Sequence, residues 1–213
     1  MTEAVQRLVA CKDEGNGHYK EGDFKSAVAS YAKGVALLPD PDDSEDEAAP
    51  ADLDPEMRKQ GAVLLCNRAA AYMSDNKPIP ALADAQRASD IDPSNWKAHW
   101  RVGLALMMMN VRLERSEQVG PARAPRTRAH PPDAVPQSRT LLQRVYQVSE
   151  RGVPALRPPL AQAVAAFERA RKCPALPAAE VENVDQGIAR AKYRLKEGQD
   201  ALDMPDMSNC VIA

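Results

Sequence analysis

One spacing of residues occurs twice along the chain and constrains the fold more than any other feature. In the first copy, four residues follow Gly15 at offsets of 12, 16, 19 and 24, namely Ala27, Tyr31, Gly34 and Pro39. In the second copy, the same offsets from Ala69 lead to Ala81, Ala85, Ala88 and Pro93. Small residues let two helices approach closely, a large residue fills the gap, and the proline ends the second helix. The spacing predicts two helical hairpins of one design.

A third copy begins at Trp96 and is interrupted. Gly103 takes the first position, and three later residues restore the internal intervals of the spacing, namely Ala163, Phe167 and Ala170. Ala163 follows Gly103 by 60 residues instead of 12, an excess of 60 − 12 = 48. We therefore predict an insertion between the two helices of the third hairpin.

The spacing resembles that of the tetratricopeptide repeat. The resemblance implies an all-α fold, a right-handed superhelix of three hairpins with a C-terminal capping helix, in a single domain made of residues 1–110 and 159–204. The repeats are expected at about 8–39, 62–93 and 96–110 with 160–175, and the capping helix at about 178–204. Apolar residues recur in this last stretch every three or four positions, namely Val181, Val184, Ile188, Ala191 and Leu195.

Composition agrees with packed helices. Hydrophobic residues make up 44% of the 213 residues but aromatic residues only 4%, so the apolar content is mostly Ala, Leu and Val. The longest apolar stretch, near Gly103–Met109, is far shorter than the roughly 20 residues of a membrane-spanning helix. The charged start of the chain and the scattered cysteines favour a cytoplasmic protein with reduced thiols.

Three segments lie outside the repeat pattern. Residues 40–55 are rich in acid and proline and are expected to form a solvated loop. Residues 111–158 are rich in Arg and Pro, which favours a disordered insertion with at most a short helix at Ser138–Glu150. One hypothesis for this insertion is translated non-coding sequence, and another is a lineage-specific addition. Residues 205–213 form a tail.

Five polar residues fall on the helices that line the concave face of such repeats, namely Lys12, Asn16, Asn67, Lys97 and Arg101. Two pairs among them are four residues apart, so each pair shares one helix face. Lys and Arg give charge-assisted hydrogen bonds, and Asn amides fix orientation without adding charge. The set predicts a receptor for carboxylates.

The same five residues resemble the carboxylate clamp of co-chaperones that bind the EEVD tails of heat-shock protein 90 and heat-shock protein 70. The resemblance implies that Lys12, Asn16, Asn67, Lys97 and Arg101 grip the terminal and side-chain carboxylates of such a peptide. Two alternatives stay open, a groove that only hydrates its charges and one that binds another acidic peptide. Asn67 has a further interpretation, as a packing residue bonded to a neighbouring loop.

Other chemistry finds little support in the sequence. The three histidines form no metal or acid–base motif, and no Gly-rich phosphate loop is present, so we expect neither a cofactor nor an enzyme. The insertion has one aromatic residue and no Lys, which argues against nucleic-acid binding. The last four residues, beginning at Cys210, fit a prenylation motif, although the preceding residues lack a basic signal; a frayed tail is the alternative. Membrane contact is expected only with prenylation.

The leading prediction is therefore a cytosolic adaptor, or co-chaperone, that docks on a chaperone tail. A scaffold subunit that does not use the clamp is the first alternative. A fragment of an enzyme whose catalytic domain lies elsewhere is the second. The choice between the two chaperones, the client and the oligomeric state stay open.

Overall fold

The computed structural model describes residues 2–39, 54–118 and 158–197, and every regular element in these ranges is helical. The helices are α1 (Glu3–Lys20), α2 (Phe24–Val35), α3 (Pro55–Ser74), α4 (Pro78–Ile91), α5 (Trp96–Gln118), α7 (Pro158–Lys172) and α8 (Val181–Glu197), with a short 3₁₀ helix at Ala178–Glu180 before α8. The all-α prediction is thus confirmed for these ranges. The predicted helix at Ser138–Glu150 and Cys210 lie outside them.

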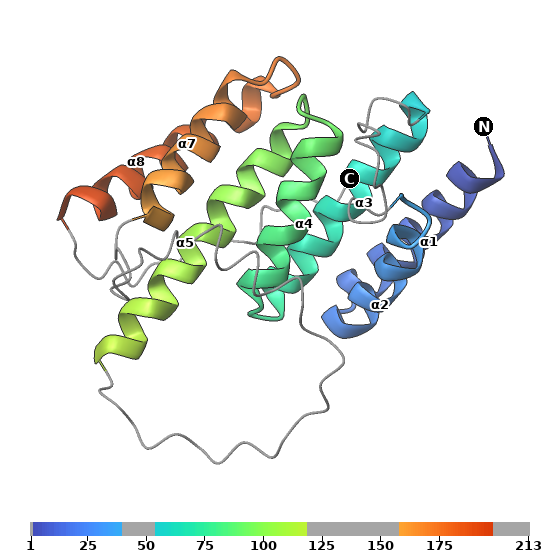
Figure 1. The fold of residues 1–213 in the computed structure, drawn as a ribbon, viewed down its shortest axis with the longest axis horizontal. Helices are drawn as coiled ribbons and strands as arrows, with labels where there is room; N and C mark the ends of the chain where they lie inside the picture. Colours follow the sequence, from blue (N-terminus) through green and yellow to red (C-terminus); the bar gives the residue numbers. More distant parts are fainter. Residues whose placement is uncertain (1, 40–53, 119–157, 198–213) are drawn as a thin grey trace, which may run out of the picture.

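Helices that are neighbours in the chain pack in antiparallel pairs (Figure 1). The pairs are α1 with α2, α3 with α4, and α5 with α7, and α8 packs on α7. α1 also contacts α3, and α3 contacts α5, so the first helices of the three pairs form one layer. This layer carries all five residues of the predicted clamp.

Gly103 and Phe167 form the contact that the interrupted spacing requires. A side chain at Gly103 would collide with the Phe167 ring, just as one at Gly15 would collide with the Tyr31 ring. Phe167 is fully buried, and its ring centroid lies 4.8 Å from that of Trp100. The second half of the third hairpin therefore docks in the predicted register despite the long separation in the chain.

The turns inside the first two hairpins share a backbone feature. Gly22 (φ +80°) and Asn76 (φ 56°) adopt the left-handed conformation, and both lie seven residues after the small residue that starts the spacing. Gly and Asn are the residues that best tolerate this conformation, which ends a helix. Asn110 occupies the same position of the third copy, yet α5 continues through it.

The end of α5 corrects the predicted boundary at residue 110. The helix runs eight residues further, to Gln118, because residues 111–118 contain neither Gly nor Pro, and the first of these breakers are Gly120 and Pro121. Two smaller differences occur elsewhere. Pro55, assigned to the acidic loop, is the first residue of α3, where proline is favoured. The capping segment begins as a 3₁₀ turn, and its described α-helix ends at Glu197.

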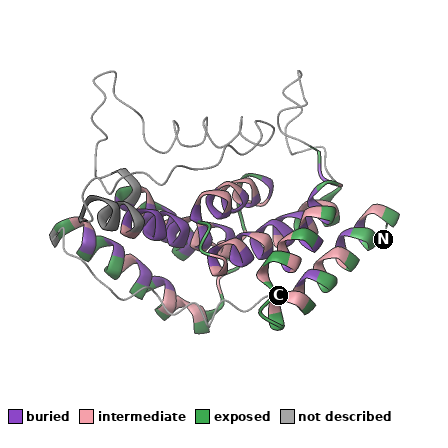
Figure 2. Ribbon diagram, turned by 90° about the horizontal axis from the view of Figure 1, so that it is seen from below, coloured by how far each residue is buried: buried purple, intermediate pink, exposed green. Residues whose placement is uncertain are grey.

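Burial is greatest in the middle of the stack (Figure 2). α3 has ten buried residues, including Leu64, Leu65 and Ala69, whereas α1 has only three. On α8, Val184 and Ala191 are fully buried, and Ile188 is partly buried against the core. These are three of the five apolar positions predicted for the capping helix, and they cover the open end of the α5–α7 pair.

We expect deletion of residues 111–158 to keep the fold and to raise its free energy of unfolding by about 2 kcal/mol. The deletion restores the interval of 12 after Gly103 and places Asn110 at the turn. The free-energy cost of closing a loop rises with the logarithm of its length. A connection of about 39 residues therefore costs roughly 2 kcal/mol more than a connection of about three residues. Thermal and denaturant unfolding measure the change. A deletion variant that does not fold would show that the segment is integral to the domain.

Candidate functional site

Two predicted amides meet between the first helices of the first two pairs. The Asn67 side chain on α3 donates through Nδ2 to Oδ1 of Asn16 on α1 at 3.1 Å. The hydroxyl of Tyr31 on α2 donates to the same Oδ1 at 2.7 Å. Because two donors occupy the Asn16 oxygen, its Nδ2 group is turned away from both of them. The NH₂ group of Asn16 therefore points away from Tyr31 and Asn67, an orientation in which it can donate a hydrogen bond to another group.

Arg101 on α5 is a deeply buried cation. It is 2% exposed, and its Nε has no hydrogen-bond partner among the described residues. Its neighbour is the Cys66 thiol on α3. Burial raises the pKa of that thiol, and the charge and hydrogen bond of Arg101 only oppose this rise, so the sulfur stays neutral and provides no compensating charge. No acidic side chain in the described ranges forms an ion pair with Arg101.

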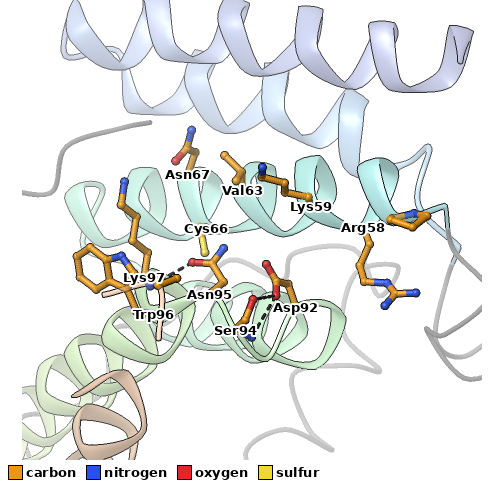
Figure 3. A pocket seen from close by; sticks show the side chains of 12 residues that line it. Arg58, Lys59, Val63, Cys66, Asn67, Asp92, Ser94, Asn95, Trp96 and Lys97 are labelled. Atoms are coloured by element: carbon orange, nitrogen blue, oxygen red, sulfur yellow. Dashed lines mark hydrogen bonds between the residues drawn. The ribbon is translucent and has the colours of Figure 1, made fainter. Parts of the chain in front are cut away.

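Lys97 lies one turn before Arg101 on α5. It lines a pocket of about 470 Å³ between α3 and the α4–α5 turn (Figure 3). Its ammonium group lies 6.0 Å from the centre of the Trp96 ring. Residues of four kinds line the pocket: cations, one acid, small polar groups and apolar contacts. They are Pro55, Arg58, Lys59, Val63, Cys66, Asn67, Asp92, Ser94, Asn95, Trp96, Lys97 and Ala175.

The structure thus places four of the five predicted residues near one another. Asn16 and Asn67 are bonded directly, and the charges of Lys97 and Arg101 both act on Cys66, next to Asn67 in the chain. Lys12 lies one turn before Asn16 on α1, with a side chain 18% exposed and its Nζ 4.0 Å from the Asp13 carboxylate. The pocket itself is lined by Asn67 and Lys97 but not by the other three predicted residues.

The sequence analysis did not single out the Tyr31 hydroxyl, which donates to Asn16, or Lys59, which lines the pocket. Tyr31 sits at a packing position of the repeat spacing, and only its hydroxyl distinguished it from an apolar residue. The ring is buried against Gly15, while the hydroxyl orients Asn16. Lys59 lies eight residues before Asn67, and this interval places both on one face of a helix. That interval was a signal available in the sequence.

Two other kinds of site find no support in the described ranges. No group of three or more His, Cys, Asp or Glu side chains there is arranged to hold a metal ion. None of the helices in those ranges is both long and apolar enough to cross a bilayer.

Comparisons with known proteins give partial matches. No protein-family model matches the chain. It is 33% identical over 93 residues to protein unc-45 homolog B of Xenopus laevis, which covers 44% of the chain and 8% of that protein. It is 36% identical over 87 residues to tetratricopeptide repeat protein 4 of Mus musculus, covering 41% of the chain and 18% of that protein. The chain therefore spans less than a fifth of either relative.

A solved structure agrees over a longer range. The C-terminal TPR-containing domain of a Plasmodium falciparum FK506-binding protein matches with a TM-score of 0.50 and 14% identity, over 92% of this chain and 93% of that one. At this identity the match concerns the fold alone. It shows that the helices of this chain have the fold of a TPR-containing domain, and the partial match to tetratricopeptide repeat protein 4 agrees with that fold.

Proposed function

We propose that this chain is a cytosolic adaptor whose three tetratricopeptide repeats and capping helix form a receptor for acidic C-terminal peptides, such as the EEVD tails of heat-shock protein 90 and heat-shock protein 70. It acts by binding and not by catalysis. The five residues of the receptor are Lys12, Asn16, Asn67, Lys97 and Arg101.

The buried guanidinium of Arg101 is the observation that carries the proposal. Moving a cation out of water costs several kcal/mol unless an anion or several hydrogen bonds compensate it. The described residues offer Arg101 a neutral thiol and no acid. A ligand carboxylate would supply the missing charge, and Lys97 one turn away would share it.

The two amides support the same chemistry. Tyr31 and Asn67 hold the oxygen of Asn16, so that its NH₂ group is presented to a ligand. A carboxylate has only acceptors, and it therefore fits a site made of amide NH₂ groups, an ammonium and a guanidinium. A peptide that ends in Asp brings two such groups close together.

We expect the pentapeptide MEEVD to bind the full chain with a micromolar Kd, about −7 to −8 kcal/mol. Amidation of its C-terminus should weaken binding at least tenfold, because one of the two clustered carboxylates is lost. Isothermal titration calorimetry measures both peptides, with a scrambled peptide of the same charge as control. Equal affinity for the acid and the amide would refute the carboxylate receptor and favour a scaffold that does not use it.

A further inference from the structure

The pocket continues along α3 beyond the predicted receptor. Asn67, Val63 and Lys59 recur at intervals of four residues, and all three line it. Figure 3 shows their side chains in a row along one side of α3, with that of Lys59 extended along the helix toward Val63. Asn67, a member of the proposed receptor, and Lys59 therefore line the same pocket two turns of α3 apart, with Arg58 beyond Lys59.

The charge of the pocket favours an acidic occupant. Arg58, Lys59 and Lys97 line it, against one acid, Asp92. The Asp92 carboxylate already accepts hydrogen bonds from the backbone N (3.1 Å) and Oγ (2.6 Å) of Ser94. Lys59 is exposed and forms no ion pair with any acid in the described ranges. An incoming carboxylate therefore meets an available ammonium group there.

The distance from Lys59 to Asn67 along α3 indicates which residue of a bound peptide would lie at Lys59. Eight residues of α-helix separate Lys59 from Asn67, a rise of about 12 Å at roughly 1.5 Å per residue. An extended peptide advances about 3.3 Å per residue, so about 12 Å corresponds to three or four residues. Val63 lies midway and is half-buried, and it provides an apolar contact for the residue between the two ends.

We propose that Lys59 forms a second acid-binding subsite, which receives a carboxylate side chain three or four residues before the terminal residue of the peptide. This inference rests on the proposed function, since the terminal carboxylate at Asn67 sets the register. The ligand class is accordingly an extended C-terminal peptide with an acid at its end and a second acid at this fixed distance.

Four peptides test the distance in the full chain. Each ends in Val-Asp and carries one Glu at the second, third, fourth or fifth position before that Asp, with Ser elsewhere. Fluorescence anisotropy should show the third or fourth position binding about two- to fivefold more tightly than the others, the range typical of an exposed ion pair. Lys59→Glu should abolish this preference and weaken the preferred peptide about five- to tenfold.

Lys25→Glu is the matched control, because Lys25 is also exposed but lies on α2, outside the pocket. It should leave the preference intact. Four equal affinities, or a preference that survives Lys59→Glu, would overturn the subsite while leaving the terminal receptor in place. If the amidated peptides bind as tightly as the acids, the proposed function itself fails.

Discussion

We expect Arg101→Met to weaken binding of an acidic C-terminal peptide by about 10- to 100-fold, roughly 1.5–3 kcal/mol, while making the free protein more stable. Arg101 is among the largest fully buried side chains, and its Nε has no partner in the described ranges. Methionine fills a similar volume without the charge. The variant therefore removes the group that would bind the peptide carboxylate, and it also removes the free-energy cost of burying a cation.

The choice of methionine follows from the burial. Arg101→Ala would open a cavity in the packed layer. The stability lost through that cavity would hide the stability gained by removing the buried charge. Calorimetry with MEEVD and urea unfolding of the free protein measure the two effects. Arg190→Met on α8 is the control, since Arg190 is exposed and far along the chain from the receptor. If Arg101→Met unfolds the protein or leaves peptide affinity unchanged, Arg101 is a structural residue.

The contacts inside the hairpins were predictable because they depend on residue size and interval. A small residue opposite a large one is needed wherever two helices approach closely. That is why Gly103 and Phe167, 64 residues apart, meet as Gly15 and Tyr31 do at an interval of 16. The 48 extra residues change the connection but not the faces that must pack.

The composition of residues 111–158 as a whole does not predict the end of α5, because its proline and glycine residues are unevenly distributed. Its first eight residues lack helix breakers and simply extend the helix, whereas proline and glycine become frequent only after Gln118. The composition of residues 111–118 alone predicts the observed end. The left-handed turn at Gly22 and Asn76 offered a second marker, since Asn110 holds the same place.

The closeness of the two asparagines was predictable from the sequence, but the burial of Arg101 was not. Helical intervals placed Asn16 and Asn67 on facing helices, and the structure brings them to 3.1 Å. The burial of Arg101 could not be predicted, because arginine is ordinarily exposed and its depth here depends on the neighbouring Cys66 and on how closely α3 and α5 approach. The orientation of Asn16 likewise depends on a hydroxyl from another helix, that of Tyr31.

Asp84→Ala should cost about 3–5 kcal/mol of unfolding free energy, the largest loss of stability we expect from a single substitution. Asp84 on α4 accepts two hydrogen bonds from Arg68 on α3, at 2.6 and 2.7 Å, and the two side chains are only 8% and 15% exposed. Burial raises the pKa of the Asp84 carboxyl, and the Arg68 hydrogen bonds oppose that rise. Removing Asp84 leaves the Arg68 cation buried without its partner.

Asp185→Ala is the matched control, because Asp185 pairs with Arg171 at 2.9 Å but both side chains are about half exposed, 52% and 45%. Exposed pairs contribute about 0–1 kcal/mol, so this variant should be nearly neutral. The double variant Arg68→Met with Asp84→Ala should recover part of the loss, since the unpaired charge is gone. Urea unfolding of the variants measures these differences. Equal losses of unfolding free energy at Asp84 and Asp185, or a double variant whose loss equals the sum of the two single losses, would show that burial of the unpaired cation is not the cause.

Because Arg68 follows Asn67 directly on α3, peptide affinity measured on the double variant then shows whether the ion pair also holds the Asn67 amide in place.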